Sequence, residues 1–245
     1  MMGLCALLAV SCGTKTAKID GTLSEAPQKQ VIVKLQDVST YTVLDTVKTD
    51  AAGHYSYKVP VSEGQPEFVY IYYGDTKISS LLLQAGDVVK VVTDTLGNGT
   101  VEGSEESVKL QENEKKFAKF LNDASNAQSV AEYNQIYIDY YRSAVKYVMS
   151  NPKSLTTLPV LFQNVTPDFP VFSQNTDALH FRSVADSIKA AYPDSKYVKV
   201  LENEAKRREN VLSFNAHFTT ATELAYPDIK SKDINGNDVR LSEVD

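Results

Sequence analysis

The chain has 245 residues, of which 42% are hydrophobic, so it is long enough to bury two modest cores. It carries 25 basic and 31 acidic side chains, a net charge of −6, and neither sign is gathered into a tract. This balance excludes the basic footprint of a nucleic-acid-binding protein. The densest basic stretch, residues 206–208, lies among glutamates that we expect to neutralise it on one helix: Glu202, Glu204 and Glu209.

A short apolar run, residues 4–11, stands directly before Cys12. A membrane-spanning helix needs about 20 residues, whereas a run of this length before small residues is typical of a secretory signal peptide. The sequence Ala9-Val10-Ser11-Cys12 resembles a bacterial lipobox. That resemblance implies cleavage before Cys12 and acylation of Cys12, which would make it a lipid anchor. The alternative is an apolar N-terminus of a cytosolic protein, without a targeting role.

The only two cysteines are Cys5 and Cys12, both in this N-terminal region. We therefore expect no internal disulfide and no cysteine-based nucleophile or metal site in the remainder of the chain. The three histidines have no spacing typical of zinc ligands: His54, His180 and His217. The sequence predicts no catalytic residue, no metal site and no cofactor.

Residues 17–103 alternate between apolar and polar side chains, and turn residues interrupt the alternation at short intervals. This pattern predicts about eight strands and an antiparallel β-sandwich. The expected strands are Ile19–Leu23, Gln30–Gln36, Thr42–Lys48, His54–Val59, Glu67–Tyr72, Lys77–Leu83, Val88–Thr93 and Gly99–Val101.

After Gly103 the apolar residues recur every three or four positions, which predicts helices. Ser104 is the expected N-cap of the first helix, whose apolar face is interrupted only by Glu114. A second helix should end at Asn151-Pro152. Further helices are expected from Ser154 to Phe162, from Ala178 to Tyr192 and from Ser195 to about Leu212, with an extended loop at Pro167 and Pro170 and favourable ion pairs Glu202–Lys206 and Glu204–Arg208.

Five tyrosines follow the second helix at helical spacing: Tyr133, Tyr137, Tyr140, Tyr141 and Tyr147. Aromatic faces of this kind line some grooves that bind sugars or peptides. In a chain without tryptophan, the same spacing is also typical of a packed helix face, and we favour that interpretation. Glu105 and Glu106 are interpreted as helix-start charges and not as an acid/base pair, because neighbouring helix residues point in different directions.

The C-terminal stretch contains Asn235-Gly236 between apolar residues, a strong signal for a β-hairpin. The pattern Ala225-x-Pro227-Asp228, then Asp233-x-x-Gly236 and Leu241-Ser242, resembles the first hairpin of the thioredoxin-like domain in the TlpA/ResA and AhpC/TSA families. That resemblance implies a redox Cys-x-x-Cys motif beyond Asp245. The alternative is an ordinary surface turn.

A second resemblance covers most of the first half. The motifs Asp20-Gly21-Thr22-Leu23, Thr49-Asp50-x-x-Gly53-x-Tyr55, Leu81-Leu82-Leu83-x-x-Gly86-Asp87-x-Val89 and Val101-x-Gly103-Ser104 occur in this order. Together they resemble the DUF4369-type N-terminal domain that precedes a thioredoxin-like domain in lipoproteins of the Bacteroidetes.

These expectations give an α+β protein in four parts: 1–16 as lipoprotein signal and anchor, 17–103 as β-sandwich, 104–220 as helical domain and 221–245 as the start of a truncated thioredoxin-like domain. The resemblances imply a non-catalytic scaffold, anchored to the periplasmic side of the cell envelope, most readily the outer membrane. Its expected partners are the membrane, protein thiols or disulfides reached through the absent domain, and a second copy in a homodimer. Two alternatives stay open, a stand-alone envelope lipoprotein that binds glycan or protein through the β-sandwich, and a hydrolase built from scattered carboxylates.

Overall fold

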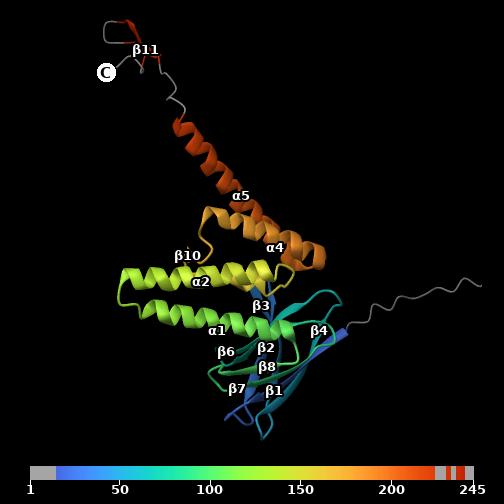
Figure 1. Ribbon diagram of the computed structural model, residues 1–245. Coiled ribbons are helices and arrows are strands. Elements are labelled where there is room, and N and C mark those ends of the chain that lie inside the picture. The colour runs from blue at the N-terminus through green and yellow to red at the C-terminus, as the bar shows by residue number, and fades with distance from the viewer. Residues whose placement is uncertain (1–14, 224–229, 233–235, 241–245) are drawn as a thin grey trace, which may run out of the picture.

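The computed structural model describes residues 15–223, 230–232 and 236–240, and it divides into a β-rich first half and a helical second half (Figure 1). Each predicted strand is present, and Val88–Thr93 has the expected bounds. The strands of the first half are β1 (Lys15–Leu23), β2 (Gln30–Asp37), β3 (Thr40–Lys48), β4 (His54–Val61), β5 (Glu67–Tyr73), β6 (Thr76–Leu83), β7 (Val88–Thr93) and β8 (Gly99–Glu102).

The strands form two four-stranded sheets, one in the order β4-β1-β7-β8 and the other in the order β3-β2-β5-β6. The prediction that all pairing is antiparallel is wrong at one place, because β1 and β7 pair in parallel, with Lys18 opposite Val88 and Leu23 opposite Thr93. Alternation of apolar and polar residues reports which face of a strand is buried. It carries no information about the direction of the neighbouring strand.

The two sheets face each other across a core built from alternate residues of both. β1 contributes Ala17, Ile19 and Leu23, all fully buried. Gly21 falls on the same face, where it leaves room for the ring of Tyr55. The two-sheet architecture expected from the period of two is therefore confirmed, and the core lies between the sheets.

The helical half begins after Gly103, whose positive φ of 90° turns the chain out of β8. Ser104 caps the first helix as predicted, and its side chain accepts a hydrogen bond from the Ser107 backbone nitrogen. The second helix ends before Asn151-Pro152, also as predicted. The helices are α1 (Glu105–Ser125), α2 (Val130–Ser150), α3 (Thr157–Leu161), α4 (Ala178–Ala191) and α5 (Lys196–Glu223), with a 3₁₀ turn η1 (Asn175–Asp177) before α4.

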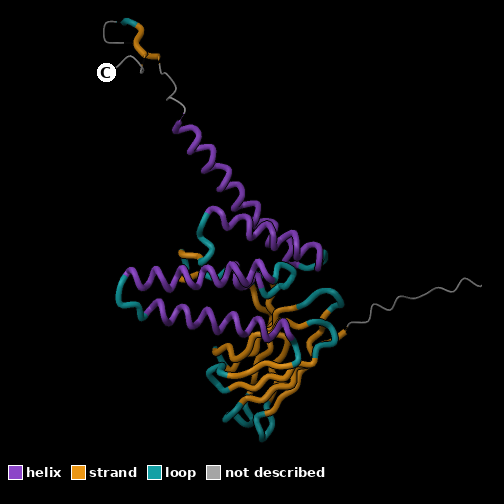
Figure 2. Tube along the Cα trace, in the orientation of Figure 1, coloured by secondary structure: helices purple, strands orange, loops and turns teal. Residues whose placement is uncertain are grey.

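A second buried cluster joins the helices to the outer face of the sheet that contains β5 and β6. Phe68, Tyr70 and Leu82 point to this face, whereas the intervening Val69 and Ile71 point into the core between the sheets. Strand β5 is therefore buried on both sides. The sheets and helices occupy opposite ends of the body but share apolar contacts (Figure 2).

Helix α1 lies along β6 and β8, which are the edge strands on one side of the two sheets. Edge strands carry unpaired backbone groups that attract foreign strands. Here the Ser107 hydroxyl accepts from Leu82 N at 3.1 Å and donates to Leu82 O at 3.0 Å. The first turn of α1 thus occupies backbone groups of β6 at this edge.

Three expectations for the helical half are wrong in extent. α3 begins at Thr157 and not at Ser154, and the loop at Pro167 contains the short strands β9 (Asn164–Thr166) and β10 (Phe169–Pro170). α5 continues to Glu223, well beyond Leu212, and passes through the expected domain boundary at residue 220. No glycine or proline interrupts residues 195–226, so no local signal ends the helix near Leu212.

The expected C-terminal hairpin is present in the described residues: β11 (Lys230–Lys232) pairs antiparallel with β12 (Asp238–Arg240). Gly236 has a φ of 83°, as a tight turn of this kind requires. Asn235 and the flanking apolar residues Ile229, Ile234 and Leu241 lie outside the described residues.

Candidate functional site

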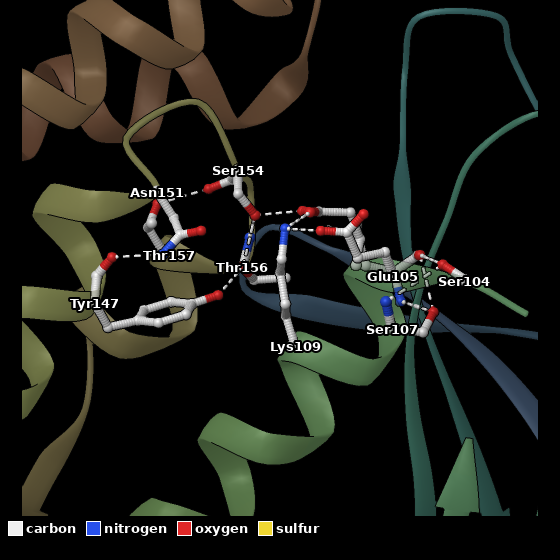
Figure 3. Close-up of polar contacts among 11 residues, drawn as sticks. Ser104, Glu105, Ser107, Lys109, Tyr147, Asn151, Ser154, Thr156 and Thr157 are labelled. Atoms are coloured by element: carbon white, nitrogen blue, oxygen red, sulfur yellow. Dashed lines mark hydrogen bonds and ion pairs between the residues drawn. The ribbon is translucent and has the colours of Figure 1, made fainter. Parts of the chain in front are cut away.

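Polar side chains from α1, α2 and the loop before α3 meet at the start of α1 (Figure 3). We call this cluster the polar junction. Ser104, Glu105, Glu106 and Lys109 come from the first turns of α1, because helical spacing places residues three and four apart side by side. The other members are Tyr147, from the end of α2, and Ser154 and Thr156, from the loop before α3.

Lys109 is the only positive charge of the polar junction and lies between two carboxylates. Its ammonium is 2.8 Å from Glu105 and 2.9 Å from Glu106. Hydrogen bonds to Glu105 and Glu106 raise the pKa of Lys109, and the bond from Lys109 lowers the pKa of Glu105. Lys109 is therefore held as a cation between the two carboxylates. The interpretation of Glu105 and Glu106 as helix-start charges is confirmed.

A chain of hydroxyl groups continues from Glu106 to α2. Ser154 Oγ donates to Glu106 Oε2 and lies 2.6 Å from Thr156 Oγ1, which lies 2.5 Å from the Tyr147 hydroxyl. Burial raises the pKa of Tyr147, so its hydroxyl remains neutral. These contacts hold the loop before α3 against the first turn of α1.

A cavity of about 590 Å³ lies beside the polar junction, and Tyr192, at the end of α4, closes part of its wall. Most of the polar groups that reach it, including Glu106 and Lys109, are already bonded to one another. The arrangement therefore connects α1 and α2 with the loop before α3, and its charged groups are paired with one another.

Glu114, which interrupts the apolar face of α1, binds the sheet. Its Oε1 atom accepts hydrogen bonds from Lys77 Nζ at 2.6 Å and from Ser80 Oγ at 2.8 Å, both on β6. A half-buried carboxylate needs such partners, because burial without them costs several kcal/mol. Glu114 thus links α1 to β6. The sequence pattern singled out Glu114 on the apolar face but did not predict its partners Lys77 and Ser80.

Polar contacts also hold α5 where it leaves the body. Arg208 donates to Phe172 O at 2.7 Å and its guanidinium lies 4.0 Å from the centre of the Phe181 ring. The predicted pair of Glu204 with Arg208 is confirmed, at 2.7 Å. The predicted pair of Glu202 with Lys206 is wrong, because Glu202 binds Lys189 of α4 instead.

The residues singled out from the sequence do not converge on one site. Cys12, the expected lipid anchor, lies outside the described residues, as does the side chain of His217. His54 lies 2.6 Å from Asp20 on the two-sheet domain, whereas His180 lies on α4. Four of the five tyrosines pack against the core, which confirms the packed-face interpretation: Tyr137, Tyr140, Tyr141 and Tyr147.

Comparison with known proteins adds no assignment to this geometry. No family model and no curated protein matches this chain. Within the described residues, no three His, Cys, Asp or Glu side chains are grouped as metal ligands would be. In the same part of the chain, no helix combines the length and the apolar character that crossing a bilayer requires.

Sequence reasoning missed the polar junction because its members are hydroxyls and charges with ordinary local explanations. Ser154 and Glu106 are separated by 48 positions, and nothing in either neighbourhood indicates the other. Only the pairing of acidic residues at the start of α1 with Lys109 was readable from helical spacing.

Proposed function

We propose that this chain is a non-catalytic, membrane-anchored scaffold of a periplasmic thiol:disulfide oxidoreductase, and that it carries a thioredoxin-like domain at the end of α5. The proposal combines the two resemblances with the way α5 leaves the body. In this arrangement the two sheets and the helices position the redox domain, and Cys12 attaches the whole protein to the outer membrane.

The observation that carries the proposal is the projection of α5. Among the α5 residues whose side chains are described, which end at Ser213, Ala205 is the last buried apolar one, and Val211 is 44% exposed. The helix nevertheless continues to Glu223, about 27 Å farther at 1.5 Å per residue. Figure 1 shows this arm extending away from the helices and sheets, with β11 beyond its end.

In this proposal the extended arm holds the domain that follows it at a distance from the body. The hairpin β11–β12 lies at the far end, within the segment that resembles the start of a thioredoxin-like domain. Two strands alone bury too little surface to be stable in water. Further strands from a following domain would give this hairpin the sheet that it lacks.

The proposal is tested by the coding sequence after Asp245. We expect it to encode a thioredoxin-like domain with a Trp-Cys-x-x-Cys motif, and the extended protein to reduce insulin disulfides in the presence of a thiol donor. The 245-residue chain, which has no cysteine after Cys12, is the matched control and should be inactive. A stop codon immediately after Asp245, or an extended protein without reductase activity, would contradict the proposal.

The anchor is tested separately. Cys12→Ser should abolish incorporation of labelled palmitate and release the protein from the membrane fraction into the soluble periplasmic fraction. Cys5→Ser, in the same region, should leave both unchanged. Labelling that persists in Cys12→Ser would exclude Cys12 as the lipid attachment site.

A further inference from the structure

A second cavity, of about 450 Å³, lies at the seam between β6, α1 and the end of α3. Ligand sites in proteins commonly have volumes of about 300–1,000 Å³ and an apolar wall with a few polar groups. This cavity is separate from the polar junction and from the C-terminal arm, so its role is independent of the function proposed above.

One wall of the cavity is apolar and includes an aromatic ring. Phe117 and Leu121 of α1 are partly buried, and Pro159 of α3 lies in the same lining. The Phe117 ring is fixed from behind, because its centre lies 6.0 Å from that of Phe120 and 5.8 Å from that of Tyr140. A rigid ring of this kind offers a flat face to a ligand at low entropic cost.

The cavity also contains hydrogen-bonding groups with spare capacity. Glu114 uses Oε1 for both of its bonds, and no described residue donates to Oε2. Gln163 accepts from the Tyr140 hydroxyl through Oε1, and no described residue accepts from its amide nitrogen. Gln111 donates to Gly99 O at 3.4 Å, and no described residue donates to its amide oxygen. These three side chains therefore offer two acceptors and one donor.

The charges restrict the ligand further. Lys77 and Lys115 line the cavity together with Glu114. Lys77 Nζ and Glu114 Oε1 are already paired at 2.6 Å, and Lys115 Nζ donates to Gly99 O at 2.9 Å. A charged ligand would compete with one member of the Lys77–Glu114 pair, whereas a neutral ligand leaves the pair intact.

We propose that this cavity binds a neutral sugar of one or two rings. The apolar C–H face of the ring packs on Phe117, its hydroxyls donate to Glu114 Oε2 and Gln111, and one ring or hydroxyl oxygen accepts from Gln163. A sugar hydroxyl both donates and accepts, so it satisfies this mixed set better than a purely apolar molecule does.

The experiment uses the 245-residue chain and saturation-transfer-difference NMR with glucose, galactose, N-acetylglucosamine and maltose. Glucuronic acid and glucosamine are the charged counterparts of glucose. We expect at least one neutral sugar to bind with a dissociation constant on the order of 1 mM. Glucuronic acid and glucosamine should bind about tenfold more weakly than glucose, because each competes with one member of the Lys77–Glu114 ion pair.

Two variants assign the binding to this cavity. Ala118 is an exposed lining residue of α1, so Ala118→Trp fills the space without removing a contact and should abolish binding. Ala131→Trp, at an exposed position of α2, is the matched control and should bind as the wild type does. Circular dichroism establishes that both variants are folded.

Glu114→Gln gives a result that misfolding cannot mimic. Loss of the carboxylate should weaken glucose binding about tenfold, since a bond to a charged acceptor is lost. The same change should strengthen glucuronic acid binding, since the repulsive charge is removed. The proposal is overturned if no neutral sugar binds saturably, if Ala118→Trp binds normally, or if Glu114→Gln changes both ligands in the same direction.

Discussion

Gly21 lies opposite Tyr55 in the β1–β4 pair, and the absence of a side chain at Gly21 leaves the space that the Tyr55 ring occupies. A Cβ atom at this position would lie 2.0 Å from Tyr55 Cζ. Tyr55 is only 2% exposed, so its ring has no room to move aside. Gly21→Ala should therefore lower the free energy of unfolding by about 2 kcal/mol, measured by urea denaturation. Ser56→Ala, an exposed neighbour on β4, should change it by less than about 0.5 kcal/mol.

A buried carboxylate holds the segment before α4. Asp177 is fully buried, and its oxygens accept from Gln174 N at 2.8 Å and from the Tyr141 hydroxyl at 2.5 Å. Burial and the contact with Asp177 raise the pKa of Tyr141. Tyr141→Phe should cost about 2 kcal/mol of stability, because the carboxylate loses a donor that water cannot replace.

The control for this change is Tyr133→Phe on the same helix, since no described residue bonds to the Tyr133 hydroxyl. It should leave the thermal unfolding temperature unchanged. Equal stability of the two variants would show that Asp177 does not depend on Tyr141.

At the scale of elements, α5 is stabilised by ion pairs within the helix, and the strength of these pairs depends on pH. Hydrogen bonds from Arg207 and then Arg208 lower the pKa of Glu204 below its usual value near 4.5. A carboxyl group with a lowered folded-state pKa stabilises the protein above its unfolded-state pKa, and the stabilisation is lost as the pH falls through the folded-state value. Glu204→Gln should therefore flatten the fall in unfolding temperature between about pH 5 and pH 3.

Glu112→Gln, at an exposed position of α1, is the control and should preserve the pH profile of the wild type. A profile that is equally steep in wild type and Glu204→Gln would mean that the contacts of Arg208 with Phe172 and Phe181 hold α5 without help from Glu204.

The elements that the sequence predicts well are those in which local chemistry decides the outcome. Alternation located each strand of the two sheets, and Ser104 and Pro152 marked helix ends correctly. The parallel pairing of β1 with β7 and the exact extent of α5 depend on distant contacts or on their absence. The candidate site behaves in the same way: Glu114 stood out on an apolar face, but Lys77 and Ser80 lie on a strand more than thirty positions earlier.

For the whole molecule, the packed body is expected to be independent of the C-terminal arm. A chain that ends at Ser213 keeps Leu201 and Ala205, the last fully buried residues among the α5 side chains that are described. Its thermal unfolding temperature, measured by calorimetry, should match that of the full chain. A chain that ends at Lys199 loses both residues and should unfold at a markedly lower temperature.

If truncation at Ser213 lowered the unfolding temperature by a large amount, residues beyond Ser213 would have to pack on the body. That outcome would also remove the main support for the proposal that α5 presents a following domain. An unchanged unfolding temperature leaves α5 free to act as that arm.

The position of β1 has a consequence for how the protein is made. This strand lies in the middle of its sheet, between β4 and β7, although among the described strands it is the first to leave the ribosome. One edge of β1 can pair when β4 has been synthesised, but the other edge stays unpaired until β7 (Val88–Thr93) has emerged. A nascent chain that paused before Val88 would expose the unpaired backbone edge of β1 to other chains. Folding only after β7 has emerged, or binding to a chaperone until then, would therefore protect the chain from aggregation.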